Sequence, residues 1–168
     1  MKAQKGWIAV TNKEQLNAFF VSCFNSILRA EESALETITN GKLTIKEIHF
    51  IEAVFLSQKV GENCLSTIAA MLGVTVGTLA TSFARLEQKG YLYKEQDKED
   101  RRIYYIVPTR LAEMIYAEHN KFHEKLVNHI AAQLSPDEFK NLVGSLKKLD
   151  DFFQDHTLKK LQDKNAKL

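Results

Sequence analysis

Two helical patterns joined by a glycine turn constrain this chain more than any other feature. Residues 74–91 repeat apolar side chains at the spacing of one helical face, namely Val76, Leu79, Phe83 and Leu86. Thr75 stands where the cap of that helix is expected. A shorter helical pattern, which Ser66 can cap, precedes it and ends at Gly73. A helix, a tight turn and a second helix outline a helix-turn-helix.

After Gly90 the periodicity changes from helical to extended. Residues 91–96 (YLYKEQ) and 102–107 (RIYYIV) are rich in aromatic and β-branched side chains and flank a polar turn. This pattern predicts a β-hairpin whose second strand ends at Pro108 and whose charged tip reaches beyond the body of the domain. A hairpin in this position forms the wing of a winged helix-turn-helix.

Two helices are expected before the helix-turn-helix. Residues 12–38 repeat apolar side chains at helical spacing and are followed by Asn40 and Gly41, a stop signal. Thr44 and Glu47 then form a capping-box pattern, which starts the second helix.

Two further helices are expected after the hairpin. Thr109 can cap a long helix, and Ser135 opens a last helix that runs to roughly Asp155, before a polar tail. The predicted fold class is therefore mainly α with a small β-hairpin wing.

Composition limits the function classes. The 168 residues fit one domain, and a hydrophobic content of 45% is enough for a core. The net charge is only +2, so any basic surface must be local. Cys23 and Cys64, without a secretory signal or metal-type spacing, favour a reducing compartment, the cytoplasm, and no disulfide. No apolar run approaches the ~18 residues that cross a bilayer, and no catalytic motif indicates an enzyme.

The outer face of the 74–91 helix carries small hydroxyl side chains where Glu, Lys and Gln are usual. Such side chains let a helix approach the base edges and phosphates of double-stranded DNA closely, and a glycine permits closer approach still. The candidate DNA contacts on the helix-turn-helix are Ser66, Thr75, Gly77, Thr78, Thr81, Ser82 and Arg85.

Cations follow in the same region and suit the phosphate backbone and a narrow minor groove. They are Arg85, Lys89, Lys94, Lys98, Arg101 and Arg102. The alternative for Arg101 and Arg102 is an ion pair at the strand end with Asp97 or Asp100, which is expected for one of the two.

Residues 72–109 resemble the winged helix-turn-helix of MarR-type repressors, with the R-L-E-x-K-G-Y motif at 85–91 and D-R-R at 100–102. The resemblance covers nearly the whole chain. Within that family the chain is most similar to the FabT-type repressors of fatty acid synthesis in Gram-positive bacteria, through the segments IKEIHFIEAV, VTVGTLATS and HNKFHEKLV. The family's usual L-T-x-x-G after the wing appears here as PTRLA, with Pro108 and Ala112.

This resemblance implies a homodimer on an inverted-repeat operator. The dimerisation helices would lie in residues 1–40 and 110–160, and the DNA-binding lobe in residues 44–108. The chain ends carry more apolar side chains than one small domain can bury, which agrees with a partner copy. They are Phe19, Phe20, Phe24, Leu142, Leu146, Leu149, Phe152 and Phe153.

The same resemblance implies no required cofactor, but a corepressor: the long-chain acyl group of acyl carrier protein, held in an apolar tunnel. Each candidate lining residue is by default an ordinary core residue. They are Phe24, Ile27, Leu28, Ile48, Ile51, Phe55, Met114, Ile115 and Phe122, with His49, His119 and His123 as polar lining.

Three other effectors remain open. His119 and His123 are spaced i, i+4 and His49 lies on a helix that packs nearby in this fold, so zinc could bind with Glu31 or Glu32. An oxidant could act at Cys23, but its helix and the next lack supporting tyrosines, and its apolar neighbours favour an inert core thiol. A small aromatic ligand is the third alternative.

Overall fold

The computed structural model describes residues 12–165, with the side chains at 37 and 154–165 left aside. Residues 1–11 of the expected dimerisation region 1–40 and the end of the expected polar tail lie outside the described residues. The elements follow in the order α1 (Asn12–Thr39), α2 (Ile45–Lys59), α3 (Leu65–Met71), α4 (Val76–Gln88), β1 (Leu92–Gln96), β2 (Tyr104–Pro108), α5 (Arg110–Ala132) and α6 (Pro136–Asn165). They fall into two compact units, up to Phe122 and from His123 onward.

The first two helices begin and end where their local signals predict. Asn40 and Gly41 take left-handed backbone angles (φ 49° and 69°), which stops α1. The capping box is complete: Glu47 N–H donates to Thr44 Oγ1 (3.3 Å), and Glu47 Oε2 accepts from Thr44 N–H (2.9 Å). The α2 start is therefore fixed by its own sequence.

The helix-turn-helix is present, with one correction to its first cap. Gly73 has φ 64° and turns the chain between α3 and α4, and the Thr75 side chain accepts from Thr78 N–H as the N-cap of α4. The N-cap of α3, however, is Cys64, and its side chain makes no capping bond. The prediction of Ser66 as that cap was wrong, because Cys64 is the last residue with an extended backbone and Ser66 already lies inside α3.

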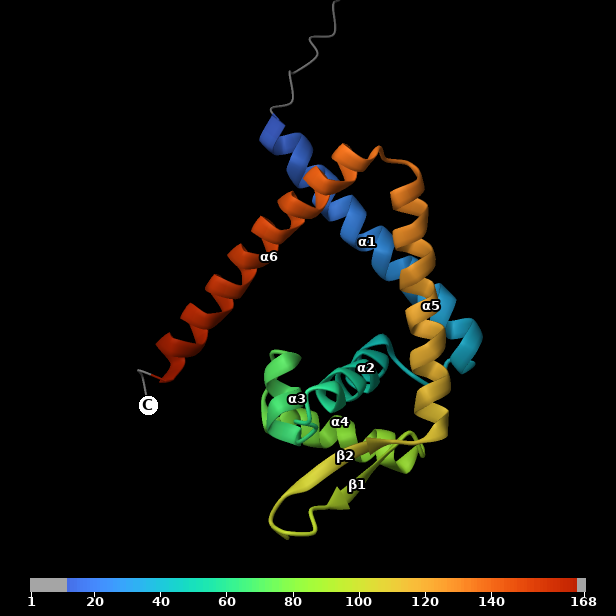
Figure 1. Ribbon diagram of the computed structural model, residues 1–168, viewed down its shortest axis with the longest axis vertical. Helices are drawn as coiled ribbons and strands as arrows, with labels where there is room; N and C mark the ends of the chain where they lie inside the picture. Colours follow the sequence, from blue (N-terminus) through green and yellow to red (C-terminus); the bar gives the residue numbers. More distant parts are fainter. Residues whose placement is uncertain (1–11, 166–168) are drawn as a thin grey trace, which may run out of the picture. The chain divides into compact units, whose positions relative to one another are not determined.

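The wing is an antiparallel hairpin in which Leu92 pairs with Pro108 and Gln96 with Tyr104. The chain entering α3 joins it: Ile106 N–H donates to the Asn63 carbonyl (2.8 Å), and Asn63 Nδ2 donates back to the Ile106 carbonyl (2.9 Å). In Figure 1 the two strands lie beside α4, within the first unit. The hairpin is thus tied to the helix-turn-helix at its base.

The core of the first unit lies between α2, α3, α4 and the base of the hairpin. Its largest fully buried side chains include Phe50, Ile51, Phe83, Leu86 and Ile106. Three of the four apolar positions expected on α4 are in this core, but Val76 is 49% exposed because it opens the helix ahead of the packed face. Burying each such large side chain contributes about 1.5–3 kcal/mol, which fixes the direction in which the polar face of α4 points.

The last two helices differ in detail from their predicted form. Thr109 precedes α5, but its hydroxyl donates to the Gly90 carbonyl (2.8 Å), so it joins the start of α5 to the turn that follows α4. Ser135 and Glu138 form the expected capping box of α6. α6 continues to Asn165, beyond the predicted end near Asp155. Within the described residues, no single helix is long and apolar enough to cross a membrane; only the bent pair α3 and α4 passes on length and composition.

Candidate nucleic-acid interface

The hydroxyl face of α4 is turned to solvent. Thr75, Thr78 and Thr81 are exposed and Ser82 is half-buried. The Thr75 and Thr78 hydroxyls share a hydrogen bond (2.8 Å). The Thr81 hydroxyl donates to the Gly77 carbonyl (3.2 Å), and that of Ser82 donates to the Thr78 carbonyl (3.3 Å). The Thr81 and Ser82 oxygens, which only donate in these bonds, keep acceptor capacity for an amino group on a base edge.

The other expected contacts on the helix-turn-helix and wing are exposed as well. Ser66, Gly77, Arg85 and Lys98 all lie at the surface. The Ser66 hydroxyl, on α3, shares a hydrogen bond with the Cys64 thiol (3.0 Å).

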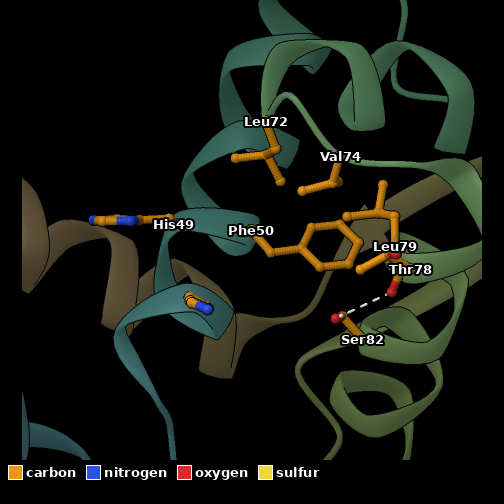
Figure 2. Close-up of a pocket in the computed structure, with 8 residues that line it drawn as sticks. His49, Phe50, Leu72, Val74, Thr78, Leu79 and Ser82 are labelled. Atoms are coloured by element: carbon orange, nitrogen blue, oxygen red, sulfur yellow. Dashed lines mark hydrogen bonds between the residues drawn. The ribbon is translucent and has the colours of Figure 1, made fainter. Parts of the chain in front are cut away.

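A pocket of about 300 Å³ lies between α2, the turn after α3, and α4. Figure 2 shows Phe50, Leu72, Val74 and Leu79 converging on it, while His49 points away from this apolar cluster. Thr78 and Ser82 also line it. The candidate DNA contacts Thr78 and Ser82 therefore line the same pocket as Phe50 and Leu79, through which α2 and α4 pack together.

Two cations expected at the DNA are engaged in the protein itself. Lys89 Nζ lies 2.7 Å from Glu47 Oε1 and donates to the Lys42 carbonyl (2.9 Å), so it joins the end of α4 to the start of α2. Burial raises the pKa of the Glu47 carboxyl, but the bonds from Lys89 and Thr44 outweigh burial and lower it overall. Lys94 Nζ lies over the Phe83 ring, 4.8 Å from its centroid.

Of the two arginines at the wing tip, Arg102 forms an ion pair with Asp100. Asp100 accepts from Arg102 Nε (3.0 Å) and Nη2 (2.9 Å), and the Arg102 side chain stays 90% exposed. These bonds lower the pKa of the Asp100 carboxyl. Asp97 Oδ1 accepts the backbone N–H of Glu99 and Asp100 (2.8 and 2.7 Å), which fixes the turn. The ion pair expected for one arginine is thus formed by Arg102.

A buried polar cluster joins α1, α2 and α5. Glu31 Oε1 lies 2.7 Å from His119 Nε2 and 2.9 Å from His49 Nε2. Glu31 and His119 are buried, and Glu52 Oε2 lies 3.9 Å from His119 Nδ1. Burial raises the pKa of the Glu31 carboxyl, but the bonds from His119 and His49 outweigh it, and the pKa lies below its ordinary value. One ligand atom from each of the three lies within 4.8 Å of the others.

The candidate acyl-lining residues do not share one environment. Phe24 and Leu28 are about half exposed on α1, and Met114 is 60% exposed on α5. Ile48, Ile51 and Ile115 are buried, whereas Ile27, Phe55, Phe122 and His123 are half-buried. Phe55 stacks on Tyr116, with ring centroids 4.3 Å apart. Met114 and Ile115 line a common pocket.

Cys64, which the sequence analysis did not propose as a reactive thiol, has a lowered pKa. Hydrogen bonds from Ser66 and Thr67 lower its pKa to about 7. Cys23 is half-buried on α1, beside Phe20 and Phe24, which stack on one another. No sequence signal reveals the Cys64 environment, because its partners become neighbours only when α3 begins at Leu65.

Large apolar side chains are exposed on α1 and on α6. On α1 they include Leu16 (52% exposed), Phe19 (61%) and Phe24 (52%); on α6 they include Leu146 (51%) and Phe152 (52%). A soluble monomer rarely exposes such stripes.

Comparison with known proteins agrees with this geometry. The model of the MarR family matches residues 61–104. FabT of Streptococcus pneumoniae in complex with DNA is 30% identical, with a TM-score of 0.79 over 86% of this chain and 99% of that one. MepR of S. aureus in its DNA complex shares the fold, at 19% identity and a TM-score of 0.69 over 85% of this chain and 99% of that one.

A curated relative, the HTH-type transcriptional regulator BilQ of Clostridioides difficile (strain CD3), is 30% identical over 90 residues, 53% of this chain. The match spans 61% of that regulator's length. Together with the near-complete coverage of the S. pneumoniae protein, these matches identify the family. The chain belongs to the MarR family of transcriptional regulators.

Proposed function

We propose that this protein is a homodimeric repressor of fatty acid biosynthesis genes that binds an inverted-repeat operator and is modulated by long-chain acyl-acyl carrier protein. The observation that carries the DNA-binding part is the exposed hydroxyl face of α4, backed by the core through Leu79, Phe83 and Leu86. The likeness to a FabT in complex with DNA supports the same assignment.

In this proposal α4 enters the major groove. The hydroxyl oxygens of Thr78, Thr81 and Ser82 accept from base amino groups. The Thr81 and Ser82 hydrogens remain on helix carbonyls, and the Thr78 hydroxyl keeps its hydrogen bond with the Thr75 hydroxyl. Arg85 and Lys98 meet phosphates and set position without reading sequence. Two copies on a dimer reach successive grooves about 34 Å apart.

Arg102 is the better candidate for the minor groove, although its ion pair with Asp100 was expected as the alternative to a DNA contact. Asp100 fixes its guanidinium by two bonds while most of the side chain remains exposed, so little side-chain entropy is left to lose on insertion. Arg101 then contacts the phosphate backbone. Asp100 acts as a positioning residue, and its removal is expected to weaken DNA binding even though it removes a negative charge.

Dimerisation is supported by the exposed apolar stripes of α1 and α6, which a second copy would cover. The acyl-carrier part rests on the resemblance to FabT and on the apolar residues of α1 that remain open in the single chain, such as Phe24 and Leu28.

A gel-shift titration tests the proposal. Full-length protein is mixed with duplexes from upstream of fatty acid synthesis genes and with scrambled duplexes, with and without palmitoyl-acyl carrier protein. Selective binding as a dimer, with a midpoint changed by the acylated carrier and not by the unacylated one, is expected. Equal binding to both duplexes refutes the operator, and an unchanged midpoint refutes the corepressor alone. Thr78→Ala should alter base preference and leave the salt dependence nearly constant.

Zinc sensing is the second candidate, favoured by the convergence of Glu31, His49 and His119. Imidazole nitrogen and carboxylate oxygen suit zinc. Isothermal titration with zinc separates the two candidates. Binding that is no tighter than about micromolar, or that leaves DNA affinity unchanged, removes a regulatory zinc site.

A further inference from the structure

A second pocket, of about 290 Å³, lies where the end of α1, the loop before α2 and the start of α5 meet. Its apolar wall is aliphatic, with Ile38, Leu111, Met114 and Ile115. Ile115 is buried, while Leu111 and Met114 are open to solvent (51% and 60% exposed). The volume lies just below the range for ligand sites, which begins at about 300 Å³, so only a small ligand fits.

A buried hydroxyl in the wall of this pocket has no partner among the described residues. Thr39 lines the pocket and is 4% exposed, and within the described part of the chain its Oγ1 makes no hydrogen bond. Leaving such a buried group unsatisfied destabilises the folded protein, because its hydrogen bonds to water are lost and not replaced. An apolar residue would avoid that cost, so a hydroxyl here points to a molecule that bonds to it.

The charge at the pocket selects an anion. Lys42 lines the pocket, and its ammonium takes part in none of the ion pairs between described residues. The acidic residue in the wall, Glu118, lies 2.6 Å from Lys121 and is already compensated. A carboxylate held by Lys42 would therefore meet little repulsion, and its second oxygen could accept from Thr39.

We propose that this pocket binds a free medium-chain alkyl monocarboxylate. The carboxylate bonds to Lys42 and Thr39, and the alkyl chain packs along the aliphatic wall formed by α1 and α5. This site goes beyond the acyl-carrier proposal, because the ligand is an unesterified acid that needs no carrier protein. Met114 and Ile115 were expected to line the acyl tunnel; here they serve a separate, smaller ligand.

The site also touches the segment that links α4 to the wing. Tyr91, which lines the pocket, donates its N–H to the Leu86 carbonyl of α4 (2.9 Å), and its carbonyl accepts from Thr109 N–H (2.9 Å). A ligand that moves Tyr91 therefore acts on the end of the recognition helix and the start of α5 together.

Isothermal titration of octanoate and decanoate into the full-length protein tests the proposal. The parent is expected to bind saturably, and Thr39→Val and Lys42→Gln to bind about tenfold more weakly, a loss of about 1.4 kcal/mol. Octanol, which lacks the charge, should bind no better to the parent than to Lys42→Gln. Benzoate is the probe for an aromatic ligand.

Stability measurements keep the variants interpretable. Thr39→Val should be at least as stable as the parent, because an apolar group replaces an unsatisfied one. The matched control is Ser57→Ala, whose buried hydroxyl donates to the Val54 carbonyl (2.9 Å); it should lose stability and keep ligand affinity.

Failure of either acid to bind, or full affinity in Thr39→Val, overturns the site. Tighter binding of benzoate than of decanoate overturns the alkyl assignment. Because no carrier protein or DNA is present, neither result bears on the proposed repressor function.

Discussion

Replacing Glu31 by glutamine should lower the free energy of unfolding by about 1–2 kcal/mol. One carboxylate oxygen receives hydrogen bonds from two histidines, and bonds to a charged group contribute about 1.5–3 kcal/mol each against about 0.5–1.5 kcal/mol for a neutral acceptor. The change is felt fully at His119, which is buried, and only in part at His49, whose side chain is 37% exposed. In a chain of this size that is a fall in Tm of about 2–8 °C.

Glu31→Ala should cost more, about 3–5 kcal/mol, because it leaves the His119 ring buried without this partner. Glu36→Gln, an exposed carboxylate on the same helix, is the matched control and should change little. Urea unfolding of the three variants and the parent, at constant protein concentration, measures these differences.

The stability difference between the parent and Glu31→Gln should depend on pH. The pKa of the Glu31 carboxyl is lower in the folded protein than its ordinary value, so its stabilisation is present above the unfolded pKa of about 4.3 and is lost as pH falls through the folded pKa. The gap between parent and Glu31→Gln should therefore close in acid. A gap of zero near neutrality, or one that stays constant into acid, would refute the charged hydrogen-bond cluster.

Three further outcomes are expected from the candidate interface. Arg102→Ala should weaken binding to specific and scrambled duplexes by about 1–3 kcal/mol and make the salt slope shallower by about one, with a smaller loss for Arg101→Ala, as titrations at several salt concentrations would show. Cys64 should react with iodoacetamide faster than Cys23 near pH 7, because hydrogen bonds lower its pKa to about 7; equal rates by mass spectrometry would contradict this. Lys89→Met should lower the free energy of unfolding by about 1 kcal/mol in urea, since it leaves a buried carboxylate of α2 without its cation.

The helix boundaries could be predicted because their signals are local. The Thr44 and Ser135 capping boxes and the left-handed Asn40 and Gly41 act within a few residues of chain. The end of α6 was missed because no stop signal follows Asp155, so the helix continues.

The roles of individual side chains depended on tertiary contacts and could not be predicted as well. Lys89 looked like a phosphate contact, yet its partner Glu47 lies 42 residues away in the sequence. Glu31 was only one of two candidates beside the histidines until α1, α2 and α5 came together. The Thr39 hydroxyl, unpartnered within the described chain, has no sequence signature at all, because it depends on what fails to lie nearby.

Helix α2 connects the buried cluster to the recognition helix. His49 reaches Glu31 and His119, whereas the next residue, Phe50, packs against Leu79 of α4 (Figure 2). Successive residues point about 100° apart around a helix. A change at the cluster that rotates α2 therefore also moves Phe50, against which α4 packs. A ligand can use this connection only if it binds one orientation of α2 more tightly than the other. A shift of the DNA-competent population from 1:99 to 99:1 would need a preference of about 5.5 kcal/mol, more than one lost Glu31 bond supplies. An effector that acts on one histidine bond of the cluster alone therefore cannot switch DNA binding fully.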